Sequence, residues 1–230
     1  MTKILDGKKI STKILDELIG KISSLSVKPH LVVVLVGEDS SSQLYVGMKE
    51  KMAVKLGMKS TVIRYPVDID EDVLLDKIDE LNNNKDVHAI LVQLPLPKQI
   101  SEKKVIQAIC PKKDVDGFTP ENIGRISIGA EPYAYPCTPK GVLRILDEYK
   151  IDLAGKHVVI IGRSNIVGKP LAQMILNRNS TVTICHSQTK NLSDITKTAD
   201  ILVSAVGKYK LIKNEMIKTN CLIIDVGTST

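Results

Sequence analysis

Tyr45 and Lys49 stand four residues apart in a predicted helix, which serines 40–42 can cap and which runs to about residue 56 before a glycine. Positions four apart share one helical face, so a phenol and an amine would project together. The segment directly follows an apolar run at 31–36 that predicts a buried strand, and ligands bind at the carboxyl ends of such strands. The same spacing also occurs on ordinary solvated helices, so the pair alone does not establish a site.

Gln93 ends a second apolar run, residues 89–92, and two prolines among the next four residues prevent the strand from continuing. Its amide is therefore expected at the carboxyl edge of the sheet, where ligands bind. Further on, the run Lys113-Asp114-Val115-Asp116-Gly117-Phe118 places two carboxylates next to a glycine. A solvated strand-end glutamine and a plain Asp-Gly turn remain open as alternatives at these two places.

A glycine-containing turn, residues 162–168, joins a β-branched strand at 157–161 to an apolar helix at 171–178. In this context the backbone N–H groups at the start of a helix receive a pyrophosphate. The turn differs from G-x-G-x-x-G, because Ser164 replaces the second glycine and Gly168 comes one residue late. We therefore expect the pyrophosphate to sit less closely than in a standard site. A tight strand-to-helix turn without a ligand is the alternative.

The choice of nucleotide depends on the residues that follow the next predicted strand, 181–185. The chain continues His186-Ser187-Gln188-Thr189-Lys190, which contains no carboxylate to repel a 2′-phosphate. Arg163 and Ser187 could hold such a phosphate. The sequence therefore predicts NADP rather than NAD. Short-chain dehydrogenases also use a Tyr and Lys pair, but there it follows the nucleotide motif, and here it precedes Gly162, so we reject that family.

Strand and helix patterns alternate along most of the chain, and the strands are apolar on both faces, which is typical of parallel sheets covered on both sides. Residues 111–136 interrupt this rhythm with Pro, Gly and polar residues. We expect an α/β fold of two domains with a cleft between them. Residues 1–120 would form a βα catalytic domain, and 121–230 a Rossmann-like NAD(P)-binding domain, with 121–150 as connector and helix. Further strands are expected at 61–65, 201–206 and 222–226, and further helices at 10–25, 73–81, 101–109 and 138–149. Thr138 would cap the last of these helices, with Pro139 at its first position.

The composition excludes several classes of protein. Hydrophobic residues make up 43% of the 230 residues and charged residues 25%, as in ordinary globular proteins. No apolar run reaches the roughly 20 residues of a membrane span, and the charged N-terminal segment predicts no export signal, so we expect a cytoplasmic protein. The net charge is +6, but only 3% of residues are aromatic, which favours small anions over nucleic acid. The four cysteines are too widely spaced to predict a metal site.

Taken in order, five motifs resemble the bifunctional methylenetetrahydrofolate dehydrogenase/cyclohydrolase family. Their order and spacing agree over almost the whole chain, and residues 181–189 and 225–227 extend the match. Five motifs in sequence are far more specific than any one of them. The motifs are Tyr45-x-x-x-Lys49, Gln93-Leu94-Pro95-Leu96-Pro97, Lys113-Asp114-Val115-Asp116-Gly117-Phe118, Pro136-Cys137-Thr138-Pro139-Lys140-Gly141 and Gly162-Arg163-Ser164-x-x-Val167-Gly168-x-Pro170.

The resemblance implies an NADP-dependent enzyme that oxidises 5,10-methylenetetrahydrofolate to 5,10-methenyltetrahydrofolate and hydrolyses this to 10-formyltetrahydrofolate. It implies that Lys49 is the general acid/base, that Tyr45 orients the folate, that Gln93 hydrogen-bonds Lys49 and that Asp116 accepts donors from the pterin. Ser42, at the start of the same helix as Tyr45 and Lys49, is a weaker candidate for a site residue. It also implies a homodimer that binds tetrahydrofolate derivatives, with no nucleic acid, membrane or metal. The NADP-binding set would comprise Gly162, Arg163, Ser164, Gly168, Ser187, Val206, Gly207 and Thr228.

The family normally continues beyond Asp225-Val226-Gly227 with a Pro- and Gly-rich loop at the folate cleft and a final helix. Neither follows Thr230 here, so we expect either a fragment or an unusually short member that lacks the usual C-terminal segment. The alternative is therefore that the protein is a truncated relative of this family that binds a dinucleotide but catalyses weakly. A nucleic-acid binder would rest only on the positive charge and is disfavoured by the few aromatic residues.

Overall fold

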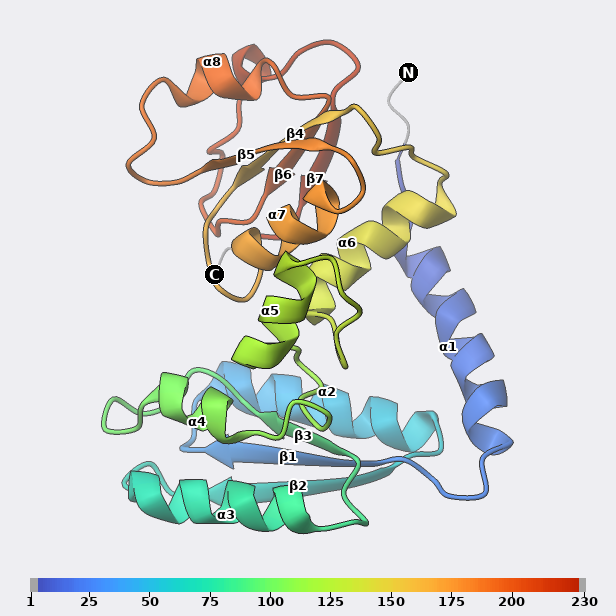
Figure 1. Ribbon diagram of the computed structural model, residues 1–230, viewed down its shortest axis with the longest axis vertical. Helices are drawn as coiled ribbons and strands as arrows, with labels where there is room; N and C mark the ends of the chain where they lie inside the picture. The colour runs from blue at the N-terminus through green and yellow to red at the C-terminus, as the bar shows by residue number, and fades with distance from the viewer. Residues whose placement is uncertain (1–3, 228–230) are drawn as a thin grey trace. The chain divides into compact units, whose positions relative to one another are not determined.

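The computed structural model describes residues 4–227, and its chain divides into two compact units, Met1–Asn122 and Ile123–Thr230. Each unit is a parallel α/β sheet with helices on both faces (Figure 1). The predicted fold class, α/β with parallel sheets, is confirmed. No helix within residues 4–227 is long and apolar enough to cross a membrane.

The first unit contains a three-stranded sheet with the order β2-β1-β3, in which both strand pairs are parallel. The central strand β1 therefore lies between the other two, and helices α2 and α3 connect the strands in sequence (Figure 1). The elements are α1 (Gly7–Ser23), β1 (His30–Val36), α2 (Ser40–Lys55), β2 (Lys59–Tyr65), α3 (Glu71–Asn83), β3 (Ala89–Val92), α4 (Glu102–Ala108) and α5 (Pro120–Ser127), which runs into the second unit.

The alternation of side chains along β1 divides the core of the first unit into two layers. Val32 and Val34 pack with residues of α3 and α4, including Leu74 and Val105. Val33 and Leu35 point to the other face, where they pack against Val46 of α2. Burial of all these side chains stabilises the sheet by roughly 1.5 to 3 kcal/mol each. It also fixes the face of α2 that turns inward, and hence the position of its polar residues.

The second unit contains a four-stranded parallel sheet with the order β5-β4-β6-β7. The strand order reverses at β4, so the carboxyl ends of β4, β5 and β6 form the edge at which such sheets bind ligands. The elements are α6 (Cys137–Glu148), β4 (His157–Ile161), α7 (Gly168–Leu176), β5 (Thr181–Cys185), α8 (Leu192–Thr196), β6 (Ile201–Ser204), the 3-10 helix η1 (Asn214–Met216) and β7 (Leu222–Asp225).

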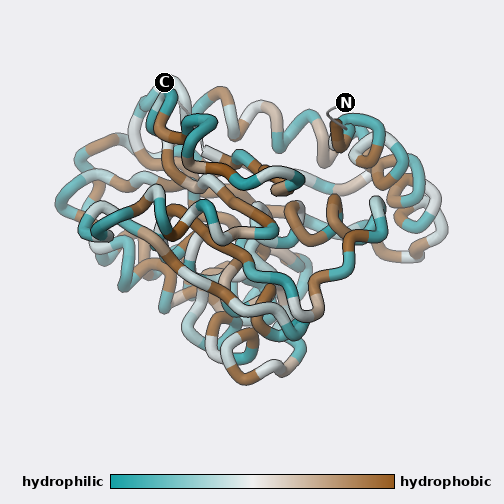
Figure 2. The backbone as a smooth tube through the Cα atoms, turned by 90° about the horizontal axis from the view of Figure 1, so that it is seen from above, coloured by the Kyte–Doolittle hydropathy of each residue, from teal (hydrophilic) through white to brown (hydrophobic). Residues whose placement is uncertain are grey.

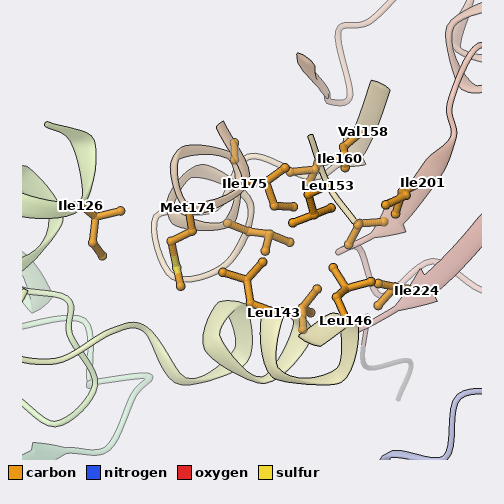
Figure 3. Packing of buried hydrophobic residues seen from close by; sticks show 14 residues of the cluster. Ile126, Leu143, Leu146, Leu153, Val158, Ile160, Met174, Ile175, Ile201 and Ile224 are labelled. Carbon is orange, nitrogen blue, oxygen red and sulfur yellow. The ribbon is translucent and has the colours of Figure 1, made fainter. Parts of the chain in front are cut away.

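Helices α6 and α7 cover one face of this sheet. Figure 3 shows Leu143 and Leu146 pointing from α6 toward Ile160 and Ile224 of the strands. The opposite face carries a smaller cluster around Val159 and Ile161. Figure 2 shows hydrophobic and hydrophilic residues alternating along the helices, as expected for helices with one buried face.

Several of the expected helix boundaries and caps are wrong. Helix α6 begins at Cys137 after Pro136, so Pro139 lies in its first turn rather than at its first position. The connector expected at 111–136 contains helix α5, which begins at Pro120 and has Glu121 in its first turn. The N-cap of α2 is Asp39 rather than a serine, because its Oδ1 accepts the Ser42 N–H at 2.7 Å.

Candidate active site

Lys49 and Gln93 are joined by a hydrogen bond across the first unit. Lys49 Nζ lies 3.0 Å from Gln93 Oε1. Lys49 projects from α2, and Gln93 directly follows β3, where its N–H donates to Val34 O of β1 at 2.9 Å. The amine and the amide thus meet at the carboxyl end of the sheet, the edge at which open parallel sheets bind ligands.

Asp116 adds a carboxylate to this pair. Burial raises the pKa of Asp116, the positive charge of Lys49 opposes that rise, and the negative charge of Asp114 adds to it. The net direction is upward, so desolvation outweighs the attraction to the lysine. Asp116 is half-buried, and no side-chain hydrogen bond to it is present within residues 4–227, so its carboxylate is suited to paired N–H donors from a ligand.

Two earlier residues of the same loop, Lys113 and Asp114, hold the loop that carries Asp116 in place. Lys113 Nζ donates to the carbonyl oxygens of Leu81, Asn82 and Asn84 at 2.9, 2.7 and 2.7 Å, so it caps the carboxyl end of α3. The Lys113 carbonyl accepts the N–H of Ile90 of β3 at 2.8 Å. Lys113 therefore ties the loop to both a helix and a strand.

Asp114 closes the other side of the same loop. Its Oδ1 accepts the Gly117 N–H at 2.9 Å, and its Oδ2 accepts the Thr119 N–H at 2.8 Å and Asn122 Nδ2 at 3.0 Å. Asp114 is 3% exposed, so these donors replace water almost completely. Sequence reasoning missed this role, because an Asp-Val-Asp-Gly stretch does not show which carboxylate turns inward.

Tyr45 lies one helical turn before Lys49 on α2 and is exposed. Its ring is therefore available to a ligand at the same face of the helix. Ser42 is different, since it is 3% exposed and belongs to the capped first turn of α2. The structure thus brings Lys49, Gln93 and Asp116 together, places Tyr45 beside them on the helix, and gives Ser42 a position in the helix cap.

The turn after β4 in the second unit brings backbone segments very close together. Gly162 has φ +124°, and a Cβ there would lie 2.7 Å from Ala205 O. A Cβ on Gly168 would lie 2.1 Å from Gly162 O. Only glycine fits at either position. Ser164 Oγ accepts the N–H groups of Val167 and Gly168 at 3.1 and 3.3 Å, so a side chain occupies two donors at the start of α7.

Arg163 and Ser187 occupy equivalent positions on neighbouring strand ends. Ile161 of β4 pairs with Cys185 of β5, and the Gly162 N–H donates to Cys185 O at 2.8 Å. Arg163 and Ser187 each follow this paired position by two residues, and both are exposed. A cation and a hydroxyl therefore stand at one edge of the sheet, and the segment 186–190 contains no carboxylate. These features fit a nucleotide with a 2′-phosphate.

The remaining predicted nucleotide residues follow β6. Val206 is half-buried and packs against the core cluster around Val159, whereas Gly207 is exposed. Both lie at the same carboxyl edge as Gly162, because the Ala205 N–H donates to Ile161 O at 2.8 Å. Thr228 lies outside the described residues. Within residues 4–227, no group of three or more His, Cys, Asp and Glu side chains could hold a metal ion.

Two family models match this chain. The catalytic domain of tetrahydrofolate dehydrogenase/cyclohydrolase matches residues 5–116, and the NAD(P)-binding domain of the same family matches residues 136–230. Among similar proteins, the bifunctional protein FolD of Thermodesulfovibrio yellowstonii is 53% identical over 98% of this chain and 79% of its own length. The bifunctional protein FolD of Geotalea daltonii is 50% identical over 100% of this chain and 82% of its own length.

Solved structures give the same result. The bifunctional FolD methylenetetrahydrofolate dehydrogenase/cyclohydrolase of Campylobacter jejuni superposes with a TM-score of 0.96 at 44% identity, covering 98% of this chain and 81% of that one. The Trypanosoma brucei methylenetetrahydrofolate dehydrogenase-cyclohydrolase, solved with NADP and an inhibitor, has a TM-score of 0.94 at 33% identity, covering 99% of this chain and 80% of that one.

Proposed function

Because this chain belongs to the tetrahydrofolate dehydrogenase/cyclohydrolase family, we propose that it oxidises 5,10-methylenetetrahydrofolate with NADP and hydrolyses the resulting methenyl compound to 10-formyltetrahydrofolate. The observation that carries this proposal is the hydrogen bond of 3.0 Å from Lys49 Nζ to Gln93 Oε1. It holds an amine near the carboxylate of Asp116, where a folate ring system can meet both groups.

Lys49 is the proton-transfer group of the hydrolysis. Attack of water on the methenyl carbon forms a C–O bond, and the amine takes a proton from that water. Ring opening then breaks the bond from this carbon to N5, which receives a proton from the ammonium group. The hydroxyl proton leaves as the formyl C=O forms, so the whole step consumes one water and releases one proton. A positioned side chain contributes roughly 10²- to 10⁴-fold to such a transfer.

The other residues of the first unit bind and orient. Gln93 holds the Lys49 amine through a neutral acceptor, so it adds no charge that would keep the amine protonated. Asp116 accepts paired N–H donors of the pterin with its two carboxylate oxygens. Tyr45 presents an exposed aromatic ring from the same helix as Lys49, and such a ring can stack on the folate.

The second unit binds the nucleotide. NADP, when bound, accepts a hydride from the methylene carbon of the folate. Gly162 and Gly168 allow the turn after β4 to pack tightly against neighbouring backbone, and this turn leads into the start of α7, where we place the pyrophosphate. Arg163 and Ser187 bind the 2′-phosphate, Arg163 through its charged fork of N–H donors. Val206 and Gly207 lie at the same strand edge, and we assign them to the nucleotide site with them.

Family resemblance also supports a homodimer that works in the cytoplasm, binds tetrahydrofolate derivatives and has no nucleic-acid partner. Light scattering during size-exclusion chromatography tests the dimer directly, and a mass of twice 25.2 kDa is expected. A measured mass equal to that of one chain would contradict this part of the proposal.

An absorbance assay on the purified protein tests the activity. With the protein present, methylenetetrahydrofolate and NADP should give NADPH. Methenyltetrahydrofolate without nucleotide should lose its absorbance faster with the protein than in buffer. Each reaction is followed separately, so the two activities are scored independently. Binding of NADP without turnover of either folate would contradict the proposed function and favour a protein that only binds dinucleotides.

A further inference from the structure

The segment that carries Ser187 is a closed turn. The Thr189 N–H donates to His186 O at 2.9 Å, and the His186 N–H donates back to Thr189 Oγ1 at 2.8 Å. The Gln188 N–H donates to Nδ1 of the His186 ring at 3.2 Å. Residues on both sides of Ser187 are thus bonded to one another, and one of these bonds depends on the hydroxyl of Thr189.

Ser187 stands at the tip of this turn without a bond of its own. It is exposed, and its hydroxyl has no hydrogen-bond partner among residues 4–227. The turn starts directly after β5, whose last residue, Cys185, accepts the Gly162 N–H. The base of the turn is therefore anchored to the backbone that leads into Arg163. The tip itself is held by the bonds between positions 186 and 189 and by the weaker bond from the Gln188 N–H to the His186 ring.

A hydroxyl that is held in place before a ligand arrives loses less conformational freedom on binding than one on a loose loop. Hydrogen bonds to a phosphate are also sensitive to the direction of the donor. The closure of the turn therefore affects affinity for a ligand that carries a phosphate opposite Ser187. It has much less effect on the same ligand with a free 2′-hydroxyl.

We propose that Thr189 is a positioning residue for nucleotide selection: it holds Ser187 beside Arg163 and so contributes to the preference for NADP over NAD. This inference rests on the proposed NADP site and extends it to a residue that does not touch the nucleotide. Only the side chain of Thr189 is at issue, because the backbone bond from its N–H to His186 O is kept when Val or Ser replaces Thr189.

Calorimetric binding of NADP and of NAD to the full chain tests this without requiring turnover. Thr189→Val keeps the branched shape and removes the hydroxyl acceptor. We expect it to lower the ratio of NADP to NAD affinity about five- to tenfold, the loss associated with one hydrogen bond. Thr189→Ser restores the acceptor and should restore the ratio. Thr198→Val is the matched control, since the Thr198 hydroxyl bonds to the His157 ring at 3.1 Å and not to the 186–189 turn.

A double-mutant cycle identifies the route of the effect. If Thr189 acts through Ser187, then Thr189→Val should cause no further loss of preference in a Ser187→Ala background. The inference would be overturned if the losses of preference caused by Thr189→Val and Ser187→Ala were fully additive. It would also be overturned if the ratio of NADP to NAD affinity in Thr189→Val stayed within about twofold of the wild-type ratio. Either result with tight NADP binding by the wild type would leave the proposed function standing. A wild type that binds neither nucleotide would contradict both.

Discussion

The amide of Gln93 has one orientation toward Lys49. Its Nε2 donates to Leu94 O at 2.7 Å, so Oε1 is the atom that faces the amine, and it accepts from Lys49 Nζ at 3.0 Å. The two hydrogen bonds use different ends of the amide, which assigns the oxygen and the nitrogen without ambiguity. A neutral acceptor therefore holds the proton-transfer group.

Gln93→Glu keeps the length of the side chain and replaces this neutral acceptor by a carboxylate. The added negative charge favours the ammonium form of the neighbouring amine, so hydrolysis of methenyltetrahydrofolate should slow by about 10- to 100-fold at pH 7. Part of the rate should return as the pH rises. Gln93→Met, which has neither acceptor nor charge, is the control and should be slow at every pH. A fast Gln93→Glu variant at pH 7 would contradict the role of the neutral amide.

Asp116→Asn should raise stability while weakening folate binding. Burial and Asp114 raise the pKa of Asp116, so its charged form is unfavourable in the folded protein. That cost is absent below the ordinary pKa of an aspartate and appears as the pH rises through the higher folded pKa. Urea unfolding should therefore show a more stable variant at pH 7 and equal stabilities at the acid end. A variant less stable than wild type at pH 7 would show that the attraction to Lys49 dominates instead.

Asp114→Asn should damage the loop that carries Asp116. An amide at this position has one oxygen, but three donors, from Gly117, Thr119 and Asn122, face the carboxylate. At least one donor is left without an acceptor, so the free energy of unfolding should fall by about 2 kcal/mol. The KM for folate should rise with it. Asp152→Asn is the control, because the Asp152 carboxylate accepts only the exposed Ala154 N–H from residues 4–227, and it should change stability by less than about 0.5 kcal/mol.

Arg163→Ala should narrow the preference for NADP over NAD. The guanidinium group and Ser187 follow paired strand ends, so both can reach one phosphate. Removing the charge should weaken NADP binding about tenfold or more and leave NAD binding nearly unchanged. Isothermal titration with the two nucleotides measures this. An equal loss for both would mean that Arg163 contacts a part of the nucleotide common to NADP and NAD.

The strands were predictable because their residues are β-branched and apolar on both faces. The strands at 157–161 and 181–185 have the predicted bounds. The first is buried along almost its whole length, whereas the second lies at the edge of the sheet and is only partly buried, so its bounds followed from its β-branched residues rather than from burial. Helix α5 was missed because it is short and lies among turn-forming residues. The N-cap of α2 was assigned to serines, although Asp39 next to them is the stronger acceptor.

The candidate site, too, could be predicted from the sequence only in part. The positions of Lys49 and Gln93 followed from helical spacing and from the prolines after β3, but the meeting of their atoms depends on how α2 packs on the sheet through Val46. The separate roles of Asp114 and Asp116 depend on which carboxylate the backbone turns inward. No pattern of residue types specifies that choice, because both are aspartates within one turn.

The decay of methenyltetrahydrofolate absorbance in the presence of Lys49→Met tests the central claim most directly. Met has about the length of Lys and no amine, and residue 49 belongs to the first unit, whereas the nucleotide turn belongs to the second. We expect hydrolysis to fall by at least about 100-fold, to near the rate in buffer, with the NADP dissociation constant unchanged. Hydrolysis by Lys49→Met within a few-fold of the wild-type rate would contradict the account, because another group would then be transferring the proton.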